Sequence, residues 1–86
     1  MTKSIALILV DKRKENAVNV QKILTDWGCL IKTRLGIHDG VLDNCTNSGF
    51  IMLELVGDAT KKKQLIDKLK VLSGVDARLI ELAVAE

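Results

Sequence analysis

Proline is absent from this chain of 86 residues, and Trp27 and Phe50 are its only aromatic residues. A core must therefore be built from Ile, Leu and Val, in which the chain is rich: apolar residues make up 48% of it. A chain of this length has room for one small domain with one core. Residues 1–86 are accordingly expected to fold as a single unit.

A strong charge of one sign is also absent. The 13 basic and 11 acidic residues leave a net charge of +2. This balance excludes a highly charged disordered segment, and it lacks the concentrated positive charge that is typical of nucleic-acid binders. No direct nucleic-acid partner is expected.

Long hydrophobic runs are missing as well. The apolar run over 5–10 is too short for a membrane span or a signal-peptide core, and charged residues follow it at once. We therefore expect a cytoplasmic protein with no membrane partner. Cys29 and Cys45 are then expected to be free thiols, because the cytosol keeps such pairs reduced.

The order of the hydrophobic periods predicts the fold. Period-2 and continuous apolar runs indicate strands, and apolar residues spaced at three and four positions indicate helices. In chain order we expect a strand over 4–10, a helix ending near Trp27, a strand over 31–37, a strand over 50–56, a helix ending near Leu72 and a strand over 75–82.

This β-α-β-β-α-β order predicts an α+β domain: a four-stranded antiparallel sheet with two helices on one face. Right-handed crossovers leave room for a strand between the first and second strands and between the third and fourth. The first and third strands should therefore lie at the centre. The alternation over 31–37 predicts that Ile31, Thr33, Leu35 and Ile37 share one face of an edge strand.

The sheet face without helices should be polar in a monomer, but both central strands are apolar on both parities. An exposed apolar surface of that size usually marks an interface. We predict a homo-oligomer, a dimer or tetramer, formed through Ala6, Ile8, Phe50 and Met52. The alternative is a face shielded by the aliphatic stems of Lys and Arg.

The connection between the second and third strands holds the only histidine and several possible ligands. We predict a ligand-binding site at His38, Asp39, Asn44 and Cys45. Imidazole and thiolate ligands favour a transition metal, which makes His38 and Cys45 candidate metal ligands, with a second subunit completing the set. The alternative is a solvated turn in which His38 ends a strand and Asp39 caps a bend.

Other chemistries are poorly supported. A nucleophilic Cys45 would have His38 as its only base and no third residue to orient that base, so no catalytic residue is assigned and an enzyme is not expected. RNA-binding domains of this topology stack bases on aromatic residues of the third strand. Here the stretch over 49–55 offers only Phe50.

Four short segments resemble the iron-only hydrogenase system regulator family: Ile23-Leu24, the stretch over 34–37, the stretch over 49–53 and the stretch over 72–75. The resemblance covers nearly the whole chain. It implies a ferredoxin-like, ACT-type βαββαβ domain that is oligomeric, regulatory and related in shape to the C-terminal domain of nickel-responsive repressors. The stretch over 11–14 lacks the glycine usual in amino-acid-binding ACT domains, which argues against an amino-acid ligand.

Two classes of function follow. The first is a small regulatory, ligand- or metal-sensing oligomer that needs a regulatory partner protein to reach DNA, since the chain has no helix-turn-helix motif. The second is a structural protein–protein interaction module with no bound ligand. Retention of a metal or metabolite would distinguish the first class from the second.

Overall fold

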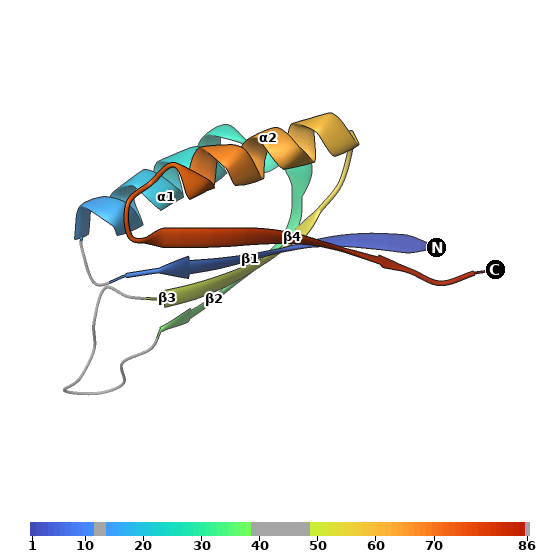
Figure 1. The fold of residues 1–86 in the computed structure, drawn as a ribbon, viewed down its shortest axis with the longest axis horizontal. Helices are drawn as coiled ribbons and strands as arrows, with labels where there is room; N and C mark the ends of the chain where they lie inside the picture. The colour runs from blue at the N-terminus through green and yellow to red at the C-terminus, as the bar shows by residue number, and fades with distance from the viewer. Residues whose placement is uncertain (12–13, 39–48, 86) are drawn as a thin grey trace.

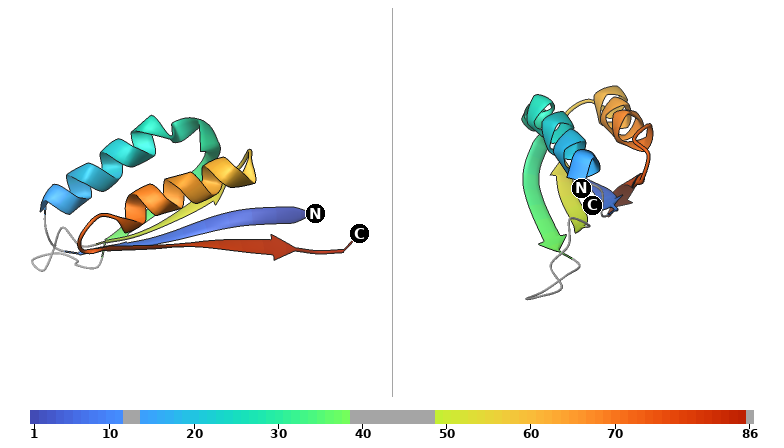
Figure 2. Two further views of the ribbon diagram at one scale, coloured as in Figure 1. Left: turned by 45° about the horizontal axis from the view of Figure 1, so that its top comes forward. Right: turned by 90° about the vertical axis from the view of Figure 1, so that its left-hand side faces the viewer.

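The fold is a sheet of four strands covered on one face by two helices (Figures 1 and 2). The computed structural model describes residues 1–11, 14–38 and 49–85. The elements are β1 (Thr2–Val10), α1 (Lys14–Asp26), a short 3₁₀ turn η1 (Gly28–Leu30), β2 (Ile31–His38), β3 (Gly49–Leu55), α2 (Ala59–Lys70) and β4 (Val75–Ala83). The predicted βαββαβ order is confirmed.

The strands run in the order β2-β3-β1-β4, and each is antiparallel to its neighbours. This confirms that the first and third strands are central and the second and fourth are at the edges. β1 therefore pairs on both sides, with β3 and with β4. Side chains on one face of β1 enter the core, and those on the other face form the sheet surface that points away from the helices.

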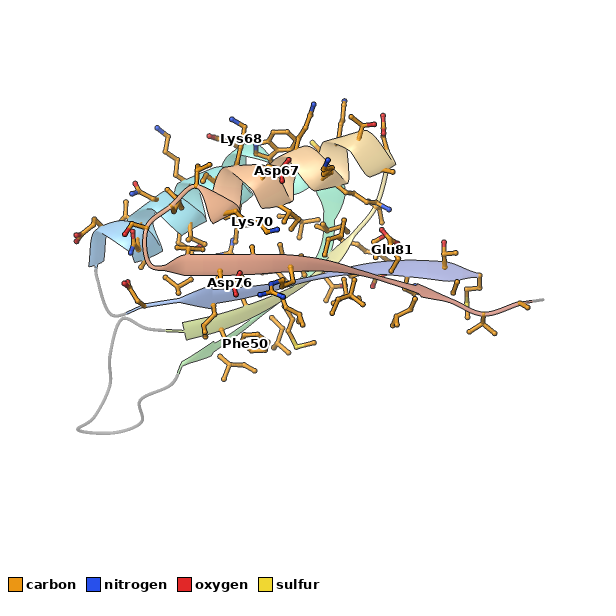
Figure 3. All side chains as sticks on the ribbon, in the orientation of Figure 1. Phe50, Asp67, Lys68, Lys70, Asp76 and Glu81 are labelled. Atoms are coloured by element: carbon orange, nitrogen blue, oxygen red, sulfur yellow. The ribbon has the colours of Figure 1, made fainter. Side chains whose placement is uncertain are left out.

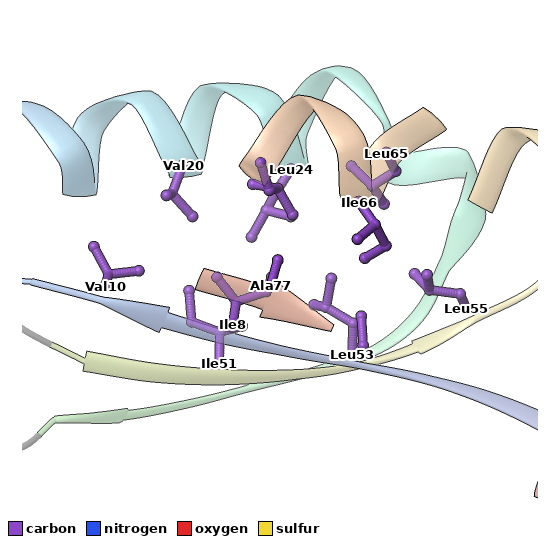
Figure 4. Close-up of a cluster of buried hydrophobic side chains, with 12 residues drawn as sticks. Ile8, Val10, Val20, Leu24, Ile51, Leu53, Leu55, Leu65, Ile66 and Ala77 are labelled. Carbon is purple, nitrogen blue, oxygen red and sulfur yellow. The ribbon is translucent and has the colours of Figure 1, made fainter. Parts of the chain in front are cut away.

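The core lies between the sheet and the helices, and even-numbered residues of β1 point into it (Figure 4). Burying these aliphatic side chains is the main favourable term in folding. The fully buried large side chains come from both layers, namely Ile8, Leu53, Val20, Leu24, Leu65 and Leu69.

Two residues predicted for an oligomer interface belong instead to this core. Ala6 and Ile8 are both 0% exposed, and they lie opposite Leu53 and Ile51 of β3. Directly paired residues of antiparallel strands point to the same side of the sheet, so Ala6 and Ile8 face the helices. Their placement on the uncovered face was wrong because both parities of β1 are apolar.

A register irregularity in β2 changes the predicted face of one residue. The pairing with β3 shifts between Ile31 and Thr33, which puts Ile31 opposite Leu55, on the helix side, where it packs against the core. Leu35 lies opposite Met52 on the other side and is 52% exposed. A bulge thus breaks the simple alternation that the sequence suggests.

Local signals fix the ends of α2. The Asp58 side chain accepts a hydrogen bond from the backbone N–H of Thr60 at 2.7 Å, which satisfies a donor that the first helical turn leaves unpaired. After the helix, Gly74 adopts a φ of 77°, a backbone conformation that glycine accepts without steric cost. The chain then enters β4, and the backbone N–H of Asp11 donates to the Gly74 carbonyl at 3.0 Å.

Candidate functional site

The sheet surface that faces away from the helices is the candidate site, and we call it the open face. In β1 and β3 the open face consists of the residues that alternate with the core positions. Leu7 lies at its centre, between Met52 of β3 and Arg78 of β4. Figure 3 shows Phe50 projecting from the sheet on the side opposite the helices.

The open face is predominantly aliphatic. Leu9 and Ile37 are 54% and 47% exposed at one end of it, and Leu35, in the same row as Leu7 and Met52, is 52% exposed. The most exposed large apolar side chains of this face, by strand alternation, are Met1, Leu9, Leu35, Ile37, Ile80, Leu82 and Val84. Seven large apolar side chains exposed by 40% or more on one sheet face are of the kind that usually marks an interface.

Charged residues lie on the open face but do not cover its apolar part. Glu54 is between Lys3, at 3.0 Å, and Lys32, at 3.9 Å, while Arg78 pairs with Asp76 at 3.4 Å on the edge strand. Shielding by basic side chains was the alternative to an interface. Leu9 remains 54% exposed beside these pairs, so the shielding is incomplete.

Glu54 is expected to titrate below its ordinary pKa of 4.5. The hydrogen bond donated by Lys3 lowers the pKa most; desolvation opposes it, and the charges of Lys3 and Lys32 and a hydrogen bond with Thr33 add to the lowering. Because the pKa is lower in the folded state, ionised Glu54 contributes stability that is present above about pH 4.5 and is lost as the pH falls through the folded pKa.

The test is an NMR titration of the Glu54 carboxyl carbon in the wild type, Lys3→Met and Lys32→Met. Lys3→Met should raise the pKa of Glu54 toward its ordinary value. Lys32→Met should raise it less, because Lys32 is farther from the carboxylate. An unchanged pKa in Lys3→Met would show that the pair does not form in solution.

A second polar cluster joins the other side of the sheet to α2. Lys62 Nζ donates to Ser4 Oγ at 2.7 Å, and Ser4 Oγ donates to Glu81 Oε2 at 2.6 Å. Ser4 is only 4% exposed, so these bonds satisfy a hydroxyl that would be costly to bury alone. Within the described residues no buried polar side-chain atom lacks a partner, and this cluster is structural.

The predicted ligand or metal site falls mostly on residues that the structure does not describe. Asp39, Asn44 and Cys45 lie outside the described residues, and His38 is the last residue of β2. Among the residues that the structure describes, no group of three or more His, Cys, Asp or Glu side chains could hold a metal ion. The ligand site therefore stays a prediction.

Two further predictions concern the thiol of Cys29 and the two helices. Cys29 is a free, exposed thiol in η1. In the described part of the chain, neither helix has the length and apolar character that crossing a membrane requires.

The predicted interface residues cover only a small part of the open face. Phe50 and Met52 lie on it as predicted, and the omitted members include Leu7, Leu9 and Leu35. The sequence did indicate that Leu35 and Arg34 lie on opposite faces of the strand, because the two residues alternate. For β1 no sequence signal existed, because the choice between its two apolar parities depends on the pairing with β3.

Comparisons with known proteins support the fold. No protein-family model matches the chain, and no curated protein is similar to it in sequence. An uncharacterized protein from Thermotoga maritima has a TM-score of 0.81 at 26% identity, over 96% of this chain and 100% of that chain.

More distant structures share the same architecture. A dimeric ferredoxin-like protein from an uncultured marine organism has a TM-score of 0.50 at 10% identity, over 99% of this chain and 95% of that one. CPII from Thiomonas intermedia K12, solved with ADP, AMP and acetate, has a TM-score of 0.50 at 15% identity, over 99% and 89%. The chain has a ferredoxin-like fold, and the resemblance to iron-only hydrogenase system regulators stays a prediction.

Proposed function

We propose that this chain is a small regulatory domain that works as a homo-oligomer assembled through the open face. The regulatory role is what the resemblance to the iron-only hydrogenase system regulators implies. The chain senses a ligand or a metal through His38, Asp39, Asn44 and Cys45, the ligands predicted from the sequence, and it carries no catalytic activity of its own. A regulatory partner protein reads its state, because the sequence contains no helix-turn-helix motif.

One observation carries the proposal: large apolar side chains from β1, β2 and β4 are exposed on the sheet face that no helix covers, and an exposed apolar surface of this kind usually marks an interface. The name of the dimeric ferredoxin-like protein adds that a chain of this fold is able to form dimers.

Met52→Lys is expected to dissociate the oligomer. Met52 lies between Leu7 and Leu35 on the open face, and an unpaired charge at the centre of an apolar contact is costly. Sedimentation velocity at tens of micromolar should find an oligomer for the wild type and a monomer for Met52→Lys. Val18→Lys is the matched control, since Val18 is 65% exposed on α1, and it should sediment like the wild type. A monomeric wild type would refute the proposal.

The sensing part of the proposal is tested at the residues predicted for it. Metal ligands must be deprotonated to bind, so zinc or nickel affinity should fall with acid and should weaken in both His38→Ala and Cys45→Ser. Titration calorimetry on these variants, with Cys29→Ser as the control thiol, measures both effects. Equal binding in all the proteins would contradict a site at His38 and Cys45.

A structural interaction module is the second candidate. The observation that favours it is the character of the open face, which is aliphatic and offers shape and apolar area for association. An oligomer that dissociates in Met52→Lys but binds neither zinc nor nickel would support this candidate over metal sensing.

A further inference from the structure

The paired ends of β1 and β4 extend beyond the rest of the sheet, and we call this ribbon the arm. β3 pairs with β1 only as far as Ser4, which lies opposite Leu55. β4 continues to pair with β1 up to Thr2, opposite Ala83. Met1 and Val84 then exchange two further hydrogen bonds, at 3.1 and 2.9 Å. The arm thus comprises residues 1–3 and 82–84.

The helices do not reach the arm. Figure 1 shows the start of β1 and the end of β4 beyond the nearer end of α2, and the left view in Figure 2 agrees. Lys62 of α2 covers Ser4, which is 4% exposed. Thr2, the next residue with the same orientation, is already exposed, so the arm lacks cover on both sides.

One side of the arm continues the open face. Leu82 lies opposite Lys3, and Met1, Leu82 and Val84 are 65%, 55% and 63% exposed. An isolated two-stranded ribbon is marginally stable in water. The apolar side chains of the arm gain little from the chain's own core, and burial against another surface would stabilise them.

We propose that the arm packs across the open face of a second copy of this chain, in a two-fold dimer whose stacked strands run in opposite directions. The proposal rests on the oligomer proposed above and specifies its geometry. The arm of each copy covers the partner's end of the open face that carries Leu9 and Ile37.

The distribution of exposed side chains supports this arrangement. Apolar side chains with high exposure lie at both ends of the open face, with Leu82 and Val84 at one end and Leu9 and Ile37 at the other, and Leu35 lies between the two ends on the edge strand. A two-fold axis perpendicular to the strands brings each end against the opposite end of the partner. Both ends are then covered by one self-complementary contact.

The length of the face favours a second copy over a small partner. β4 has nine residues, and a strand rises about 3.3 Å per residue, so a partner that covers both the sheet and the arm must extend over roughly 30 Å. A second sheet with strands of the same length meets this requirement. The charges do not oppose this contact, because Lys3 is paired with Glu54 and Arg78 with Asp76, so neither pair carries a net charge into it.

The double variant Leu82→Asp/Val84→Asp tests the arm, with Val18→Asp/Val71→Asp as the matched control. All four positions are more than half exposed, so neither variant removes a core side chain. Sedimentation velocity over a concentration series should show that the arm variant raises the dimer dissociation constant at least about tenfold, as expected for well-packed interface side chains. The control should match the wild type, and Trp27 fluorescence should show that all three proteins are folded.

Crosslinking tests the direction of stacking. In a background with Cys29→Ser and Cys45→Ser, chains with Leu9→Cys are mixed with chains that carry Leu82→Cys and treated with a short flexible bismaleimide. Crosslinked dimers should form in the mixture and much less in either chain alone. Self-crosslinking of Leu82→Cys that equals the mixture would overturn the antiparallel stack.

These results separate the two proposals. A dimer that Met52→Lys dissociates and Leu82→Asp/Val84→Asp leaves intact would overturn the role of the arm and leave the open-face oligomer standing. A wild type that is monomeric would overturn both. Loss of association in both variants, with the valine control unchanged, is the expected result.

Discussion

Ile8→Lys should leave the chain unfolded at 25 °C, whereas Leu9→Lys at the next position should leave the fold intact. Ile8 is 0% exposed in the core and Leu9 is 54% exposed on the open face. A buried, unpaired ammonium costs several kcal/mol. At about 0.05–0.15 kcal/mol per residue, the whole domain has roughly 4–13 kcal/mol of stability to lose.

This adjacent pair tests which side of β1 the helices cover. Urea unfolding followed by Trp27 fluorescence is suitable, because Trp27 packs partly buried against the core. Ile8→Lys should show no cooperative transition. Leu9→Lys should unfold within about 0.5 kcal/mol of the wild type when both are monomeric, as expected for an exposed site, and should associate more weakly. The opposite ranking would mean that the two faces of β1 have been exchanged.

Leu69→Ala should lower the free energy of unfolding by about 2–5 kcal/mol, the range for removing a buried leucine side chain and leaving a cavity. Leu69 is 0% exposed on the inner side of α2. Because α2 packs on the sheet next to β4 (Figure 2), a cavity at this position weakens the contact between the two layers. Chemical denaturation at a fixed protein concentration measures the loss.

Val71→Ala, two residues farther along the chain, is the control. Val71 is 81% exposed just after α2, so its truncation should change the free energy of unfolding by less than about 0.5 kcal/mol. If the two variants lost equal stability, α2 would not pack with Leu69 inward.

The sequence predicted some residues of the candidate site correctly and others incorrectly. Two helices cover only one face of the sheet, and the central strands are apolar on both faces. The sequence therefore predicted that an apolar face would remain uncovered. Phe50 and Met52 were assigned to that face correctly. Ala6 and Ile8 were not, since Ile5, Leu7 and Leu9 are equally apolar, and alternation alone gives two solutions of equal quality. The predicted ligands Asp39, Asn44 and Cys45 lie outside the described residues and stay predictions.

The sequence by itself determined the order of the elements and the central position of β1 and β3. These features depend on local periodicity and on the handedness of crossovers, which are properties of short stretches of chain. The tertiary structure alone decided which side of β1 is core, where the bulge turns Ile31 toward the helices, and how far the arm extends. Each of these depends on the register between strands distant in sequence, and a shift of one residue in register exchanges the two faces of a strand.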